Sequence, residues 1–139
     1  MKRFSQKHAL SVAWTQATLA LVGSLFFSLV MSLPPCDLCW YQRICIYPLV
    51  LIIGVGIVKK DKSFLLYAIP LAVIGWFFAL YHNLLYYKII PETLAPCQAG
   101  ISCTTRYYEL FGLISIPLLS LAAFSLIIVC LFGYRKYAE

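Results

Sequence analysis

Charged side chains are scarce in this sequence. Asp, Glu, Lys and Arg together make up 12% of the 139 residues, whereas 63% of the residues are hydrophobic. A soluble domain carries about a quarter of its residues as charged side chains, so this chain cannot cover itself with polar surface. The excess of apolar side chains must face lipid, in what we expect to be a single domain of residues 1–139.

Other signals are missing as well. The chain has no alternating segments of about ten residues, which a transmembrane β-barrel would need. It has no internal repeat and no low-complexity tract. Its net charge of +6 comes from short basic clusters between apolar runs, not from a basic face interleaved with aromatics. This pattern argues against nucleic acid as a partner and is typical of membrane proteins.

Long apolar runs dominate what is present. They cover residues 9–33, 40–58, 64–87 and 110–134. At 1.5 Å per residue each spans roughly 28–38 Å, against a hydrocarbon core of about 30 Å. We therefore predict an all-α fold, a bundle of four transmembrane helices. The first run is longer than the roughly 7–15 residues of a signal-peptide core and no cleavage site closes it, so we expect it to be retained.

The distribution of Lys and Arg predicts the orientation of the bundle. Eight of these 11 residues lie at the two termini and in the tight turn after the second run, and three lie on the opposite side. The positive-inside rule therefore places both termini in the cytoplasm. It places the segments at about 34–39 and 88–108 on the outer face. The second of these is long for a loop, so we regard it as a candidate functional segment.

The six cysteines fall mainly in these outer segments. Cys36 and Cys39 form a Cys-x-x-Cys motif in the first segment, and Cys97 and Cys103 lie close together in the second. Both pairs thus face the compartment in which disulfides form and persist. The other two cysteines lie inside apolar runs, where cysteine usually serves as a small buried hydrophobe.

Cys39 is predicted to lie in the first turn of the second helix, because Pro34 and Pro35 cannot continue the first one. Unpaired N–H groups and the positive end of the helix dipole stabilise a thiolate at such a position. Arg43 follows on the same helix face, only about 6 Å deeper. An ionisable side chain at that depth is costly and usually functional. These residues therefore predict a thiolate beside a cation, within reach of a membrane quinone.

His82 is the other ionisable residue inside an apolar run. It lies roughly 7 Å below the outer interface, close to the predicted depth of Arg43. A proton acceptor beside a cation would suit a quinone, which gains protons as it gains electrons. The alternative is a histidine whose ring N–H is satisfied by a neighbouring helix.

Simpler interpretations exist for the other residues too. Taken alone, the Arg43 side chain could simply extend toward the lipid headgroups, which is called snorkelling. The outer cysteines are compatible with two structural disulfides in a scaffold or a small-molecule transporter, although no polar cluster interrupts a helix at mid-membrane. A zinc site of four thiolates is disfavoured by the five residues between Cys97 and Cys103, so we predict no bound metal.

The most specific pattern is the stretch at residues 36–43, CDLCWYQR, a Cys-x-x-Cys with an arginine four positions after the second cysteine. It resembles the disulfide bond formation protein B (DsbB) family, including its shorter BdbC-type members. The Tyr81-His82 pair, the second cysteine pair and the segment from Phe111-Gly112 to Pro117 match as well. The resemblance covers nearly the whole chain.

The resemblance implies a mechanism. In a bacterial cell membrane, an outer partner of thioredoxin fold would attack a Cys97–Cys103 disulfide, with Cys97 holding the mixed disulfide. The resulting thiols would exchange with Cys36–Cys39. Cys39 would then pass electrons to menaquinone or ubiquinone, with Arg43 stabilising the charge. The protein would be a protein-dithiol:quinone oxidoreductase that drives disulfide formation.

A reductase that works in the opposite direction is the second enzymatic hypothesis. Four-helix proteins similar to vitamin K epoxide reductase use a reduced carrier to cleave disulfides on the outer side. Residue spacing fixes the chemistry but not the redox potential, so this sequence is compatible with either direction.

Overall fold

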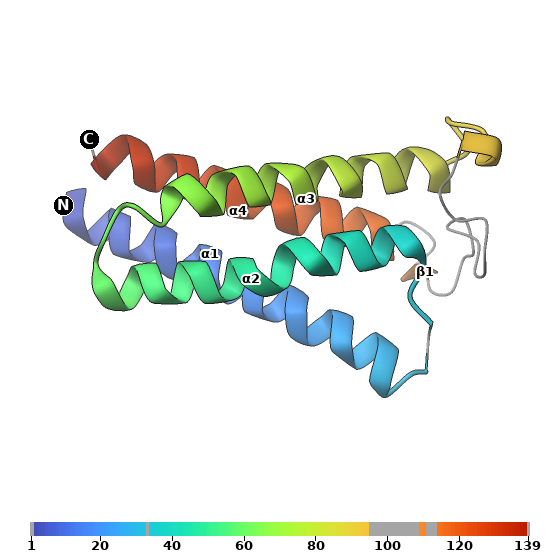
Figure 1. The fold of residues 1–139 in the computed structure, drawn as a ribbon, viewed down its shortest axis with the longest axis horizontal. Helices are drawn as coiled ribbons and strands as arrows, with labels where there is room; N and C mark the ends of the chain where they lie inside the picture. Colours follow the sequence, from blue (N-terminus) through green and yellow to red (C-terminus); the bar gives the residue numbers. More distant parts are fainter. Residues whose placement is uncertain (1, 33, 95–108, 111–113, 139) are drawn as a thin grey trace.

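The computed structural model describes residues 2–32, 34–94, 109–110 and 114–138. Its long helices are α1 (Lys2–Leu29), α2 (Asp37–Lys59), α3 (Leu65–Tyr86) and α4 (Ile116–Ala138). Four helices in this part of the chain are long and apolar enough to cross a membrane. Figure 1 shows them side by side along one axis, with both chain termini at the same end of the bundle. The predicted all-α transmembrane bundle is confirmed.

An extended segment joins the end of α1 to the start of α2 (Figure 1). α1 ends at Leu29, earlier than the predicted residue 33. α2 begins at Asp37, earlier than the predicted residue 40, because Cys36 acts as its N-cap in an extended conformation. The Cys36 sulfur accepts a hydrogen bond from the backbone N–H of Cys39 at 3.4 Å, which satisfies one of the orphan donors of the first turn. Cys39 therefore lies in that first turn, as predicted.

The fourth helix begins later than predicted. Residues Glu109–Leu110 (β1) pair in antiparallel fashion with Ile114–Ser115 (β2), and α4 starts only at Ile116. The predicted start at residue 110 was wrong because this short strand pair takes up the first part of the apolar run. Pro117 then occupies the first turn of α4, where a missing N–H costs no helical hydrogen bond. A single 3₁₀ turn, η1 (Glu92–Leu94), follows α3.

The turn between α2 and α3 is short, as predicted. Lys60 ends α2 in the left-handed conformation. The Asp61 carboxylate then accepts hydrogen bonds from the backbone N–H and the hydroxyl of Ser63, at 3.1 and 3.0 Å. The backbone hydrogen bond from Ser63 is the main reason why the pKa of Asp61 lies below its ordinary value. The turn holds α2 and α3 antiparallel.

Small side chains fill the contacts between helices. Alanines on α1 and α3 with no exposed surface are Ala13, Ala17, Ala68, Ala72 and Ala79. Gly75 on α3 lies so close to the Phe124 ring of α4 that a Cβ atom there would overlap it. Membrane helices pack in this way because small residues let their backbones approach closely.

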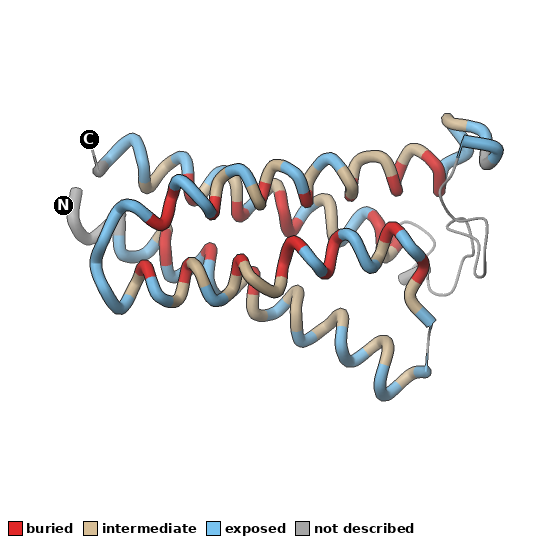
Figure 2. Tube along the Cα trace, in the orientation of Figure 1, coloured by how far each residue is buried: buried red, intermediate tan, exposed pale blue. Residues whose placement is uncertain are grey.

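The outward faces carry large apolar side chains. Leu29, Val58 and Leu66 are 76%, 81% and 75% exposed. Figure 2 shows buried residues along the inner faces of the helices and exposed ones along the outer faces. With helices of membrane-spanning length, this distribution is that of a multi-pass membrane protein whose outer faces contact lipid.

Candidate functional site

A cavity of about 340 Å³ lies among the helices at the end of the bundle opposite the termini, called here the distal end. Figure 1 shows α1 diverging from α2 toward this end. Much of the lining is apolar, with contributions from Leu19 and Phe27 of α1, Ile46 of α2 and Phe124 of α4. The polar groups that line it include Ser24, Ser28, Cys36, Cys39, Gln42, Arg43, His82 and Ser120. Cavities of roughly 300–1,000 Å³ with this mixture of groups are typical of small-molecule sites.

The first cysteine pair lies at the rim of this cavity. The sulfur atoms of Cys36 and Cys39 are 2.7 Å apart, and both residues are free thiols. The Cys36 side chain is buried, with 7% of its surface exposed. Its hydrogen bond with Cys39 and then its burial raise the pKa of the Cys36 thiol. Cys36 therefore tends to keep its proton, which leaves Cys39 as the sulfur better placed to carry a negative charge.

Two features favour charge on Cys39. It lies in the first turn of α2, at the positive end of the helix dipole. Arg43 lies one helical turn further along α2 and lines the same cavity, so its positive charge favours a negative charge on Cys39. The two sulfurs thus differ in environment although only two residues separate them.

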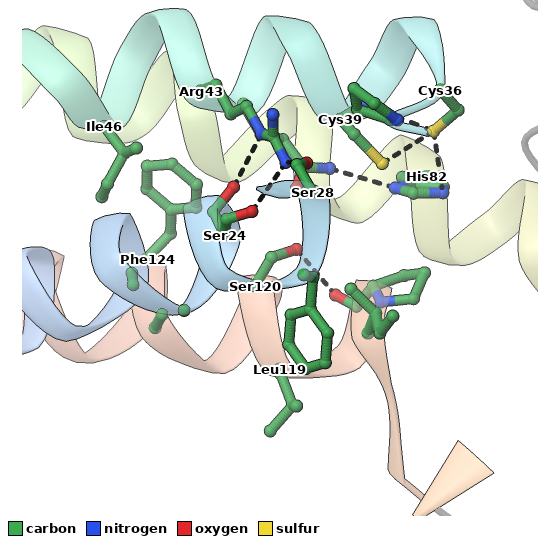
Figure 3. A pocket seen from close by; sticks show the side chains of 18 of the residues that line it. Ser24, Ser28, Cys36, Cys39, Arg43, Ile46, His82, Leu119, Ser120 and Phe124 are labelled. Atoms are coloured by element: carbon green, nitrogen blue, oxygen red, sulfur yellow. Dashed lines mark hydrogen bonds between the residues drawn. The ribbon is translucent and has the colours of Figure 1, made fainter. Parts of the chain in front are cut away.

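Arg43 points into the bundle and does not snorkel to the headgroups. Only 8% of its surface is exposed. Its Nε donates to the Ser24 hydroxyl at 2.7 Å, and one terminal nitrogen donates to the Ser24 carbonyl at 2.8 Å and to the Ser28 hydroxyl. Its guanidinium carbon lies 5.6 Å from the centre of the Trp40 ring. Figure 3 shows the guanidinium between α2 and α1, where it ties the two helices together beside the cavity.

His82 of α3 lies between the side chains of Cys36 and Gln42, at the N-terminal end of α2. Its Nε2 is 3.8 Å from the Cys36 sulfur, and its Nδ1 is 3.2 Å from the amide nitrogen of Gln42. The imidazole is 4% exposed. It therefore contacts the cysteine pair directly, in addition to lining the cavity (Figure 3).

The structure thus brings four predicted site residues around one cavity: Cys36, Cys39, Arg43 and His82. Cys97 and Cys103 lie outside the described residues, so their part in the site stays a prediction. Cys45 is buried in the main core, and Cys130 packs against the same core from α4. Neither of these two lines the cavity.

Sequence reasoning missed the three polar residues that hold Arg43 and His82 in place. Ser24 and Ser28 hold the guanidinium of Arg43, and Gln42 holds the ring of His82. A signal for the serines was present, since residues four apart on a helix share a face. Gln42 lies between the cysteine motif and the arginine in the sequence, but nothing in that position indicates a histidine partner on α3.

Comparisons with known proteins agree with the residue pattern. The family model described as "Disulfide bond formation protein DsbB" matches residues 6–133. The "Probable disulfide formation protein C 2" of Bacillus anthracis is 47% identical over 128 residues, covering 91% of this chain and 90% of that protein. The "Disulfide bond formation protein C" of Bacillus subtilis is 42% identical over 131 residues, covering 91% and 94%. No solved structure matches the chain.

A family match over this much of the chain brings with it a general activity. Proteins of this family oxidise thiols at the membrane during disulfide bond formation, together with a thiol oxidase partner. The four apolar helices and the cysteines of this chain agree with that activity. The chain therefore belongs to the disulfide bond formation protein DsbB family and is a disulfide-forming membrane oxidoreductase.

Proposed function

We propose that the protein is a thiol:quinone oxidoreductase of a bacterial cell membrane. It takes electrons from the dithiol of a thioredoxin-fold oxidase on the outer face and passes them to membrane quinone. The observation that carries the proposal is the juxtaposition of a redox-capable cysteine pair and a buried cation on one largely apolar cavity. Such a cavity between lipid-facing helices suits a lipid-soluble electron acceptor.

The residues of the cavity fit a quinone. Its aromatic and aliphatic lining can hold the ring of either menaquinone or ubiquinone, and Arg43 provides a charged donor for a ring oxygen. The described partners of this guanidinium are neutral oxygens of Ser24 and Ser28, so its positive charge is not cancelled by a carboxylate among them. When bound, a quinone accepts two electrons and two protons. Arg43 and His82 are the residues that would hold it.

The cysteines have distinct tasks in this proposal. The partner's thiolate attacks the Cys97–Cys103 disulfide, and Cys97 holds the mixed disulfide. The Cys103 thiolate released from this pair attacks Cys36 in the Cys36–Cys39 disulfide and displaces Cys39. The partner's second thiol then displaces Cys97, whose thiolate closes the Cys97–Cys103 disulfide again and frees Cys36. Cys39 leaves as the thiolate, because the helix N-terminus and Arg43 stabilise its charge. Two electrons then leave the Cys36–Cys39 pair as its disulfide closes again.

His82 acts on the other sulfur of the pair. In the tautomer that this step uses, the Gln42 amide donates to Nδ1 and the Nε2–H of His82 is directed at the Cys36 sulfur. A hydrogen bond from this N–H stabilises Cys36 when the thiol loses its proton during closure. Gln42 orients the ring for that contact.

Quinone reduction by purified protein tests this function. In detergent, with a reduced thioredoxin-fold dithiol as electron donor, we expect rapid reduction by the wild type and a loss of activity in Cys39→Ser. Cys130→Ser is the matched control, since this cysteine lies outside the cavity. Full activity of the Cys39→Ser variant would contradict the proposal. Faster oxidation of added quinol by the oxidised partner than reduction of quinone by the reduced partner would favour the reverse reductase.

A further inference from the structure

Three metal-binding atoms converge at the rim of the cavity. The sulfurs of Cys36 and Cys39 and an imidazole nitrogen of His82 all lie within 4.8 Å of one another. Figure 3 shows the three side chains directed toward a common point, from the start of α2 and from α3. Two thiolates in a Cys-x-x-Cys spacing together with one imidazole form a set that soft divalent cations prefer.

The distances are close to those of a coordinated ion. In a tetrahedral site with Zn–S near 2.3 Å and Zn–N near 2.0 Å, ligand atoms lie roughly 3.5–3.8 Å apart. The separation of Cys36 Sγ from His82 Nε2 is 3.8 Å, which already matches. The two sulfurs, at 2.7 Å, have to move apart by about 1 Å. Cys39 is the less buried of the two side chains, so the movement is assigned to its sulfur.

Gln42 completes the arrangement from behind the ring. Its amide lies 3.2 Å from His82 Nδ1. A half-turn of the amide places its oxygen there, so that it accepts the Nδ1 proton and leaves the Nε2 lone pair facing the sulfurs. Metal-binding histidines are usually held in this way, by an acceptor on the second ring nitrogen.

We propose that, when both thiols are reduced, Cys36, Cys39 and His82 bind a soft divalent cation such as Zn²⁺ or Cd²⁺. Two S–H protons are released, two metal–sulfur bonds and one metal–nitrogen bond form, and nothing is oxidised or reduced. The two thiolate charges neutralise the cation. The charge near Arg43 is then no more positive than before binding.

Binding depends on the redox state of the pair. A Cys36–Cys39 disulfide has no thiolate to offer, so the ion binds the reduced protein only. While bound, it occupies both sulfurs and prevents the disulfide from closing. The consequence for activity rests on the proposed function: Zn²⁺ would inhibit quinone reduction, and a chelator would restore it.

Anaerobic titration of the reduced, full-length protein in detergent with Co²⁺ tests the site. Co²⁺ is a spectroscopic probe whose charge-transfer absorption reports bound thiolates. We expect one ion per chain and displacement by Zn²⁺. Cys36→Ser and His82→Ala should each weaken binding by more than the roughly 10–100-fold that loss of an outer-shell partner causes, and Gln42→Leu by about that amount.

Matched variants separate this site from the other cysteines. Cys45→Ser, Cys130→Ser and the double variant Cys97→Ser/Cys103→Ser should bind Co²⁺ as the wild type does. His82→Cys keeps three ligands, so it should retain binding with a stronger thiolate absorption. If the His82→Ala protein fails to fold, the His82→Cys variant still tests whether a ligand at position 82 is needed for binding.

Several results would overturn the proposal. They are unchanged binding in His82→Ala, binding that survives replacement of both Cys36 and Cys39, and equal binding by the oxidised protein. The titration does not involve quinone. A protein that binds Co²⁺ as expected but reduces no quinone would contradict the proposed function and support the metal site. A protein that reduces quinone but binds no Co²⁺ would support the proposed function and contradict the metal site.

Discussion

Arg43 connects two helices and faces the cavity at the same time. Its hydrogen bonds to Ser24 and Ser28 use the fork geometry of the guanidinium, which a lysine cannot reproduce. Lysine would keep the charge but lose the fixed position of that charge beside the cavity. The contribution of Arg43 thus depends on where the charge lies as well as on its sign.

We predict that Arg43→Gln raises the apparent KM for quinone by about 10–100-fold, the equivalent of one charge-assisted hydrogen bond. Arg43→Lys should fall between this variant and the wild type. Initial rates over a range of quinone concentrations measure the change. Arg135→Gln is the control, because this exposed arginine lies in the last turn of α4. An unchanged KM in both Arg43 variants would remove Arg43 from the quinone site.

The Cys36 thiol provides a pH-dependent prediction. Its pKa is raised, first by the hydrogen bond with Cys39 and then by burial. At any pH near neutrality a smaller fraction of it is thiolate than in an ordinary cysteine, so its alkylation should become fast only at higher pH.

Replacing Cys39 with alanine removes the first of these causes. The pKa of Cys36 should fall, and its rate of alkylation at neutral pH should rise by about tenfold for each unit of that fall. Mass spectrometry after timed iodoacetamide treatment of the reduced protein across a pH series measures this. If the pH midpoint for Cys36 is the same in Cys39→Ala as in the wild type, the two sulfurs do not share a proton.

The polar residues of the cavity differ in how well the sequence predicted their role in the site. Arg43 and His82 could be predicted, because an ionisable side chain in an apolar run is costly and needs a reason. The spacing of Ser24 and Ser28 places them on one helix face, but neither they nor Gln42 could be assigned a role, because hydroxyls and amides also occur in membrane helices without one. The direction of the Arg43 side chain was equally open, since its acceptors, Ser24 and Ser28, lie on another helix.

At the scale of the helices, the contact between α3 and α4 depends on the absence of a side chain. Gly75 faces the Phe124 ring, and an added Cβ would overlap ring atoms. Phe124 is itself buried, with 3% of its surface exposed, so it has little room to move aside. Overpacking of this kind usually costs about 1–3 kcal/mol.

Gly75→Ala should therefore lower the thermal stability of the detergent-solubilised protein by about that free energy. Gly133→Ala on α4 is a matched control, because nothing lies within 4 Å of the position of its added Cβ. That variant should be neutral or slightly stabilising, since alanine is the better helix former. Thermal unfolding followed by circular dichroism compares the two. Equal midpoints would show that the two helices separate easily at Gly75.

The helices could be predicted from apolar runs, but their ends could not. Hydropathy marks the residues that are compatible with lipid, whereas caps and turns decide where a helix begins. Cys36 caps α2 through its sulfur, so the helix begins at Asp37 and not at the predicted residue 40. The strand pair of β1 with β2 delays α4, although the predicted apolar run already begins at Leu110.

For the whole molecule, the important question is which end of the bundle faces outward. The termini and the α2–α3 turn share one end, and Cys36, Cys39 and the cavity lie at the distal end. The positive-inside rule predicts that the distal end is extracytoplasmic, where disulfides persist. The proposed function requires the same orientation, because the partner's thiols have to reach the cysteines from outside.

Lys60 and Lys88 form a matched pair for testing this orientation. Both are exposed, both have left-handed backbones, with φ of 53° and 57°, and they lie beyond opposite ends of α3. In a background without other reactive cysteines, a membrane-impermeant maleimide added to intact cells should label Lys88→Cys and leave Lys60→Cys unmodified until the membrane is permeabilised. The reverse pattern would put the cysteine pair in the cytoplasm, where disulfides do not persist and an oxidase of this design could not supply its partner.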